Sequence, residues 1–232
     1  MLPGVAEGDY FIYKFYTLWV STSNASAPAE VQSLNQTERI KVMVTYVGGP
    51  FVVMNITRYF KNETVCWTQA MVHILNGTGN GFGLIIAPNL KPNDFAYPWG
   101  FQSGTAFKIM DSVIKKYAFG QREVLHAMVN QTGYDAYAYI SHEMYYDRKT
   151  GVMLEWRTEQ IPYADPTSKI VLVWEIVEFN VKGTGPSDGV VQLNEQEKLN
   201  NSILMITAVL SISIITVLLI YVRRKRVSLL RR

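Results

Sequence analysis

Apolar and polar residues alternate along much of the first 180 residues, as in strands that bury one face. The alternation is clearest at residues 38–47, where one face would carry Ile40, Val42, Val44 and Tyr46. Gly, Pro, Asn and Asp punctuate these segments and indicate turns. We therefore expect strands over residues 10–20, 38–47, 51–60, 64–75, 122–129, 134–146, 151–160 and 169–180.

The segments between these strands predict loops and turns. Residues 21–34 read as a polar loop, and residues 130–133 as a turn. The glycine-rich residues 77–83 lack a phosphate-binding motif and are expected to form a flexible hairpin loop. Residues 88–104, a long loop rich in Pro, Gly and aromatics, are our candidate contact surface. Residues 105–117 fit either a helix or a strand, and the whole predicts a mainly β fold, an antiparallel meander forming a curved sheet or half-barrel.

One hairpin allows a register prediction. Residues 137–147 and 151–160 should pair around Arg148–Thr150, with Gly151 supplying the positive φ of the turn. Period two then places Val152, Leu154 and Trp156 on the core face, and Met153, Glu155, Arg157 and Glu159 on the solvent face.

A different pattern begins at residue 203. Residues 203–222 form an apolar run without a charge, long enough to cross a bilayer as a helix. Four basic residues follow at once: Arg223, Arg224, Lys225 and Arg226. Because basic flanks stay on the cytoplasmic side, the sequence predicts a single-pass cell-membrane protein with its C-terminus in the cytoplasm. The expected parts are an external β domain (1–180), a polar stalk (181–202), the transmembrane helix (203–222) and a basic tail (223–232) that contacts lipid headgroups.

Charge and cysteine content limit which classes of protein this chain can belong to. The net charge of +3 includes six basic residues after the span, so residues 1–202 hold 16 basic against 19 acidic residues. Such a domain shows no basic stripe for nucleic acid. The single cysteine, Cys66, excludes an intrachain disulfide and reads as a small buried residue. The opening MLPGVAEGDYF does not resemble a signal peptide, so we expect that a leader precedes it in the exported protein. The second interpretation is a tail-anchored protein with a cytoplasmic body, which would place the six basic residues outside.

Asn-X-Ser/Thr sequons support an external location. Seven occur where composition alone predicts about two. The candidate glycosylation sites are Asn24, Asn35, Asn55, Asn62, Asn76 and Asn130, and the seventh, Asn200, lies almost at the membrane. Asn62, Asn76 and Asn130 fall in predicted turns, where a sugar meets only solvent, and we expect these three to be occupied first.

No pattern of catalytic or metal-binding residues emerges. His142-Glu143 lacks the second histidine of a zinc-protease motif, and no Gly-X-Ser-X-Gly elbow is present. His73, His126 and His142 are expected to be ordinary strand histidines, so the sequence predicts neither an enzyme nor a cofactor. A set of aromatic residues fits either a β core or the lining of a ligand groove. Its members are Tyr134, Tyr137, Tyr139, Tyr145, Tyr146, Trp67, Trp99 and Trp156.

Several short segments carry a resemblance: YYDRKTGVMLEW at 145–156, GVAEGDY at 4–10, IAPNL at 86–90 and REV at 122–124. With them the chain resembles uncharacterised archaeal cell-surface proteins that have a β-rich external domain and a C-terminal span. Its hairpin is also similar to that of the LolA/LppX-like lipoprotein carriers, which implies a half-barrel with an apolar groove, although this chain has no lipobox cysteine. Three hypotheses follow: a surface binding or structural module that meets a protein or lipid ligand, a carrier of lipids or small apolar ligands, and a membrane-tethered hydrolase.

Overall fold

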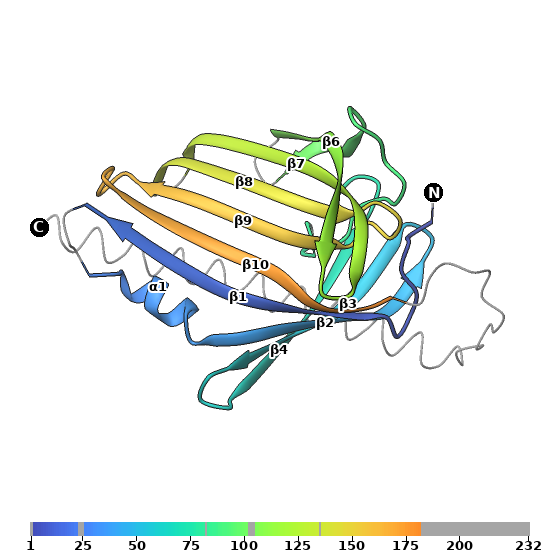
Figure 1. Ribbon diagram of the computed structural model, residues 1–232, viewed down its shortest axis with the longest axis horizontal. Coiled ribbons are helices and arrows are strands. Elements are labelled where there is room, and N and C mark those ends of the chain that lie inside the picture. Colours follow the sequence, from blue (N-terminus) through green and yellow to red (C-terminus); the bar gives the residue numbers. More distant parts are fainter. Residues whose placement is uncertain (1, 23–25, 82, 102–104, 135, 182–232) are drawn as a thin grey trace, which may run out of the picture. The chain divides into compact units, whose positions relative to one another are not determined.

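The computed structural model describes residues 2–22, 26–81, 83–101, 105–134 and 136–181. They form ten strands and one short helix (Figure 1). The elements are β1 (Tyr10–Ser21), α1 (Ala29–Leu34), β2 (Thr37–Gly48), β3 (Phe51–Phe60), β4 (Val65–His73), β5 (Phe95–Phe101), β6 (Thr105–Tyr117), β7 (Gly120–Tyr134), β8 (Tyr137–Asp147), β9 (Met153–Pro162) and β10 (Ser168–Asn180).

The predicted membrane span, basic tail and nearly all of the stalk lie outside the described residues, as do Asn24 and Asn200. Within the described ranges, no helix is both long and apolar enough to cross a bilayer.

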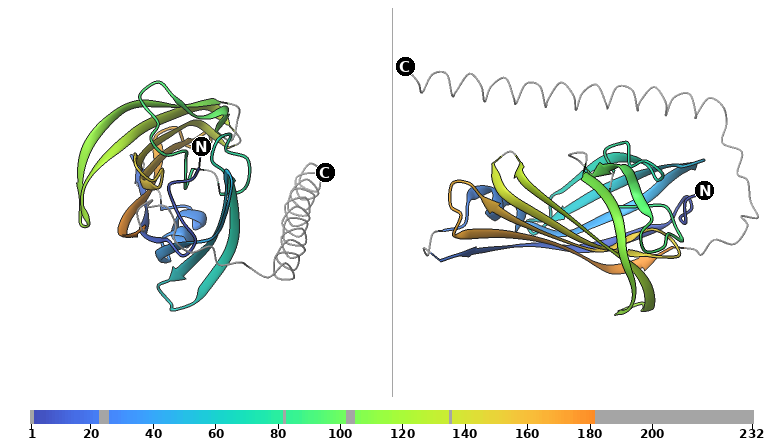
Figure 2. Two further views of the ribbon diagram at one scale, coloured as in Figure 1. Left: turned by 90° about the vertical axis from the view of Figure 1, so that its right-hand side faces the viewer. Right: turned by 90° about the horizontal axis from the view of Figure 1, so that it is seen from above.

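The ten strands form one antiparallel sheet in the order β4-β3-β2-β1-β10-β9-β8-β7-β6-β5. Two meanders, β1–β4 and β5–β10, meet where the first strand pairs with the last. β4 and β5 lie at the two ends of this order, so the sheet is open, and Figure 2 shows how strongly it curves. The prediction of a mainly β, antiparallel fold is confirmed.

Some predicted elements are wrong. The loop predicted at 21–34 contains α1, which hydrogen bonds fix to β1: the Thr17 amide donates to Asn35 Oδ1 over 2.8 Å, and the Thr17 hydroxyl donates to the Val31 carbonyl. The ambiguous segment 105–117 is a strand, and the loop predicted at 88–104 includes β5. The turn predicted at 130–133 lies inside β7, because pairing of Gln131 with Ile140 outweighs local turn propensity.

The sheet has an inner face that is mostly buried and an outer face that is more exposed. On β1 the inner face carries Phe11, Tyr13 and Phe15, while Lys14 points outward. The strand register aligns inner-face residues of neighbouring strands. Phe15 lies opposite Trp174, Trp174 opposite Trp156 and Trp156 opposite Met144. Alternation along each strand thus becomes a core on one side of the sheet.

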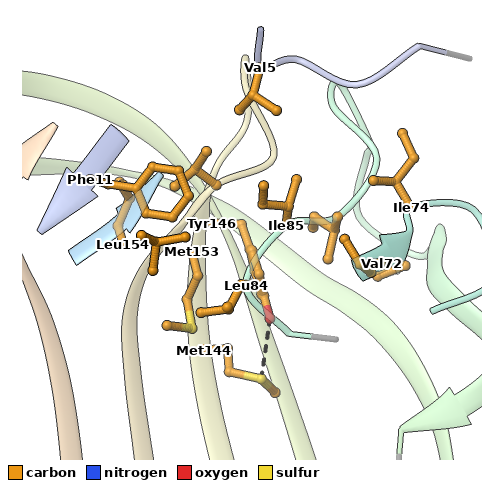
Figure 3. Close-up of a cluster of buried hydrophobic side chains, with 14 of the residues drawn as sticks. Val5, Phe11, Val72, Ile74, Leu84, Ile85, Met144, Tyr146, Met153 and Leu154 are labelled. Atoms are coloured by element: carbon orange, nitrogen blue, oxygen red, sulfur yellow. Dashed lines mark hydrogen bonds between the residues drawn. The ribbon is translucent and has the colours of Figure 1, made fainter. Parts of the chain in front are cut away.

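An irregular segment between β4 and β5 fills one end of this interior. Its buried side chains are Leu84, Ile85, Ile86, Ala87 and Leu90. Figure 3 shows Leu84 and Ile85 packed among Phe11, Tyr146, Met153 and Leu154. The side chains of this segment therefore occupy this end of the interior.

Backbone polar groups in a buried irregular segment need partners, because an unsatisfied amide or carbonyl costs a few kcal/mol. Two fully buried tyrosines, Tyr97 and Tyr146, supply partners to this segment, and a third, Tyr13, binds the adjoining strand β9. Tyr146 donates to the Gly83 carbonyl over 2.9 Å, and Tyr13 to the Met153 carbonyl over 2.7 Å. Tyr97 donates to the Ile85 carbonyl over 2.8 Å and accepts from the Gly83 amide over 3.2 Å.

The predicted hairpin of β8 and β9 is confirmed, with two register shifts, one near the turn and one at the far end of the pair. Gly151 has φ of 75°, and a Cβ there would lie 2.1 Å from the Ile86 carbonyl oxygen, so both the turn and the inserted segment require glycine. Tyr145 lies opposite Glu155 and Tyr146 opposite Met153, which leaves Leu154 as the extra residue of a β-bulge. Met153 is therefore buried beside Val152 and Leu154, and its predicted place on the solvent face is wrong.

Candidate functional site

A shallow depression lies on the outer face where β1, β8, β9 and β10 run side by side. The side chains that reach this face are Tyr16, Glu143, Tyr145, Glu155, Arg157, Val173 and Glu175; we call this the acidic depression. Arg157 is already paired, since its guanidinium lies 2.8 Å from Glu159. Three carboxylates and two tyrosines therefore dominate the surface that a ligand would meet.

Two of these carboxylates are direct cross-strand neighbours. Glu155 on β9 lies opposite Glu175 on β10, a pairing of like charges that destabilises a sheet unless other groups compensate. Glu155 is compensated: its carboxylate lies 2.7 Å from Lys115 Nζ and accepts from the Tyr117 hydroxyl over 2.7 Å. For exposed Glu175, the described part of the chain provides no ion pair; its other cross-strand neighbour is Lys14.

A histidine network adjoins the depression. His126 Nδ1 lies 3.3 Å from Asp111 Oδ2, and its Nε2 lies 3.4 Å from Glu143 Oε1. The imidazole stacks on Tyr145 at 4.7 Å, and Lys115 Nζ lies 3.7 Å from the centre of the same phenol ring. The His126 imidazole and the Lys115 ammonium group are both too near the ring to share one face, so they lie on opposite faces of it. Tyr145 therefore offers a ligand only its ring edge and its hydroxyl.

The chemistry of this network does not favour acid–base catalysis. Burial, with the hydrogen bond to Glu143, raises the pKa of Tyr145 to about 12. A catalytic acid or base works best with a pKa near the working pH. The groups beside the ring nitrogens of His126 are the carboxylates of Asp111 and Glu143, rather than the serine, threonine or cysteine that a nucleophilic mechanism requires.

His142 lies on the inner face and belongs to a second polar group. The Trp156 indole donates to its Nδ1 over 3.3 Å, and Thr158 Oγ1 lies 3.0 Å from the same atom. An indole can only donate, so Nδ1 accepts and the neutral ring carries its proton on Nε2. Burial lowers the pKa of His142 to about 4, as expected of a neutral structural histidine.

Trp156 lies beside this histidine. The prediction that Trp156 belongs to the core is only partly correct. Its ring packs against the core and stacks on Trp174 at 6.2 Å, but the side chain is half-buried. Glu155 and Arg157 point to the outer face as predicted. Glu155 is not fully solvated, because it is bound to Lys115. Glu159, on the same face of β9, is not fully solvated either, because it pairs with Arg157 and Lys169.

The described sequons have different surroundings. Asn62 and Asn76 both lie in turns, and each Oδ1 accepts from the amide and hydroxyl of the threonine two residues later. Asn130 is exposed, but on β7 rather than in the predicted turn, and accepts from the Tyr139 hydroxyl. Asn35 ends α1 with its Oδ1 bound to the Thr17 amide. Asn55 lies on the outer face of β3.

Two other sequence predictions change. Cys66 is exposed near the start of β4 rather than buried. The candidate contact loop at 88–104 contributes Leu90, Ala96 and Tyr97 to the core, so much of it serves the fold. The basic residues Arg223, Arg224, Lys225 and Arg226 lie beyond the described part of the chain. Across that described part, no cluster of His, Cys, Asp and Glu could hold a metal ion.

Sequence reasoning missed the acidic depression. Its residues come from four strands, and only the register brings them together. The alternation in β9 did signal that Glu155 and Arg157 share a face. No protein-family model matches the chain, and a search of curated proteins finds no match either.

Proposed function

We propose that this chain is a single-pass cell-surface protein whose β domain binds a positively charged partner through the acidic depression. Residues 203–222 anchor it in the membrane, and the basic residues that follow remain in the cytoplasm. The proposal assigns it a binding role rather than catalysis, in line with its resemblance to archaeal cell-surface proteins.

The observation that carries this proposal is the pair of opposed carboxylates, Glu155 and Glu175. Glu155 is neutralised within the domain by Lys115, whereas Glu175 is exposed at the depression. A cationic group bound there pairs with the Glu175 carboxylate through a charge-assisted hydrogen bond. Tyr16 adds an aromatic ring at the same place, and the ammonium group of Lys14, which lies 5.5 Å from the centre of that ring, shows that it accommodates a cation.

Binding of a hexa-arginine peptide to the full chain in detergent tests this proposal. We expect saturable binding that weakens as salt rises, because the attraction is between exposed charges. Glu175→Gln should weaken binding several-fold. Glu38→Gln on β2 is the matched control, because it removes one exposed carboxylate away from the depression. Equal binding by both variants would show that the peptide senses only the net charge.

Topology needs a separate test. Protease added to intact cells should digest the β domain and spare a tag on the C-terminus. Loss of the tag with the domain retained would reverse the proposed orientation.

A lipid-carrier function is the second candidate, favoured by the half-buried Trp156 and Trp174 on the inner face. Trp174 lies directly opposite Phe15, and Leu172 packs against the same core. Native mass spectrometry of the purified full chain would reveal a bound lipid. A Trp174→Ala variant that loses the lipid while remaining folded would support this function.

A further inference from the structure

The outer face of β2, β3 and β4 exposes large apolar side chains. Trp67 is 69% exposed, Val65 53% and Met43 38%. Single exposed apolar residues are ordinary, but neighbours gathered on one face indicate a surface that something covers. These side chains border a second shallow depression, whose lining residues are Lys41, Met43, Asn55, Thr57, Tyr59 and Trp67. We call it the sequon depression.

Asn55 lies at one end of the part of β3 that lines this depression, and the middle residue, Thr57, lies opposite both Lys41 and Trp67. Met43 on β2 and Gln69 on β4 lie directly opposite Asn55, and Trp67 lies on the diagonal. Diagonal neighbours in an antiparallel sheet are about 7–8 Å apart, within reach of an aromatic side chain. Thr57, the third residue of the sequon Asn55-Ile56-Thr57, shares the outer face with Asn55 and lies directly opposite Trp67.

The Asn55 side chain is oriented in a way that suits modification. Its Oδ1 atom is buried and has no hydrogen-bond partner. The amide nitrogen, which is the atom that carries an N-linked sugar, is therefore the accessible end of the side chain. Since period two places Asn55 and Thr57 on the same face, the two side chains that define the sequon both lie on the outer face, where each is half-buried.

We infer that Asn55 carries an N-linked sugar that packs over Trp67 and so completes the outer face of the sheet. This inference rests on the proposed function, because only an exported domain meets the glycosylation machinery. The sugar donor is a lipid-phosphate-linked oligosaccharide. The bond from its anomeric carbon to the phosphate oxygen breaks, a bond to Asn55 Nδ2 forms, the lipid phosphate departs and the amide loses one proton.

The chemistry of a sugar fits this depression. A pyranose ring has an apolar face of C–H groups that can cover the exposed indole, and hydroxyls that can reach Lys41 and Gln69 at the rim. Because it is tethered to a residue that lines the depression, the sugar does not bear the entropy cost of recruiting a separate molecule. It would also shield the edge strand β4 from pairing with other chains.

Peptide mapping of the full chain from a host that glycosylates exported proteins tests occupancy. Hydroxyl-radical footprinting of the same samples then reports how accessible Trp67 is. We expect Asn55 to be occupied and Trp67 to oxidise several-fold more slowly in the glycosylated protein than in Thr57→Val. That variant removes the sequon while keeping Asn55 and the shape of residue 57. The matched control is Thr64→Val, which removes the Asn62 sequon and should leave the Trp67 rate unchanged.

The outcomes separate the two proposals. Bare asparagines at every sequon would refute export and the Asn55 sugar together. Occupied Asn62 and Asn76 with a bare Asn55 would refute the inference but support export. An occupied Asn55 with unchanged Trp67 oxidation would refute the packing of the sugar on the indole. If Trp67 stays protected in Thr57→Val, another molecule covers this face, and the inference fails.

Discussion

The three buried tyrosine hydroxyls give the sharpest test of how the irregular interior is stabilised. Tyr97→Phe removes one oxygen atom and leaves the ring in place, so the cavity it creates is small. It also leaves two buried backbone groups unpaired: the Ile85 carbonyl and the Gly83 amide. Each unsatisfied group costs about 1–3 kcal/mol, so we expect Tyr97→Phe to lower the free energy of unfolding by about 2–6 kcal/mol.

Two further variants calibrate this value. Tyr146→Phe leaves only the Gly83 carbonyl without its donor and should cost about 1–2 kcal/mol. Tyr10→Phe removes an exposed hydroxyl that donates to Glu178, and should cost less than about 0.5 kcal/mol. The assay is thermal or urea unfolding of the full chain in detergent, followed by circular dichroism. If Tyr97→Phe matched Tyr10→Phe, the hydroxyls would not be the partners on which the segment depends.

The same tyrosines predict a loss of stability at alkaline pH. Burial raises the pKa of Tyr13, Tyr97 and Tyr146 above the ordinary value near 10. The folded state then holds protons that the unfolded state releases, so their contribution is intact below about pH 10 and is lost as pH rises further. Tyr97→Phe should make the alkaline decline in melting temperature shallower. An unchanged slope would place the origin of that decline elsewhere.

Other residues give further tests. Burial lowers the pKa of His142 to about 4, so the domain should lose up to about 3 kcal/mol of stability as pH falls from about 6.5 to 4. In melting curves recorded over a series of pH values, His142→Gln should make this decline shallower. Trp156→Ala should cost about 2–4 kcal/mol in urea unfolding, below the upper range for fully buried aromatics because the ring is half-exposed; a cost under about 0.5 kcal/mol would make Trp156 part of a binding surface rather than the core. Glu155→Gln should cost about 1–2 kcal/mol because it disrupts the bonds to Lys115 and Tyr117, whereas Glu38→Gln should cost less than about 0.5 kcal/mol; equal costs would show that the outer network adds no stability.

The strands were predictable because alternation and turn residues act locally. β3 begins and ends where the pattern predicts, and the Asp147–Gly151 turn forms around a glycine with positive φ. Helix α1 was not predictable in the same way. It has six residues, and Pro28 at its N-cap provides no capping side chain. Its place depends on bonds to Thr17, so tertiary contacts rather than local propensity determine it.

The inserted segment was missed for a related reason. Its apolar run at residues 84–87 resembles a short strand, yet it pairs only through an isolated bridge between Ile85 and Val152. Tyrosine hydroxyls from distant strands take the place of the missing ladder partners. Tyr146, for example, lies 63 positions from Gly83, whose carbonyl it satisfies. A pattern read within a window of residues cannot detect such a partner.

The bulge at Leu154 connects the fold to the acidic depression. With strict alternation, burying Val152 and Leu154 would place Met153 on the outer face. The extra residue lets Met153 be buried as well, and alternation then resumes with Glu155 facing outward. From there a single row crosses six strands: Lys14, Glu175, Glu155, Tyr145, His126 and Asp111.

Deleting Leu154 would restore strict alternation, shift one side of this row by a residue, and separate Glu155 from Tyr145. We therefore expect the deletion to abolish hexa-arginine binding even in protein that still folds, whereas Leu154→Ala, which keeps the residue count, should lower stability by about 2–5 kcal/mol and leave binding intact. Binding retained by a folded deletion variant would show that the depression does not depend on this register.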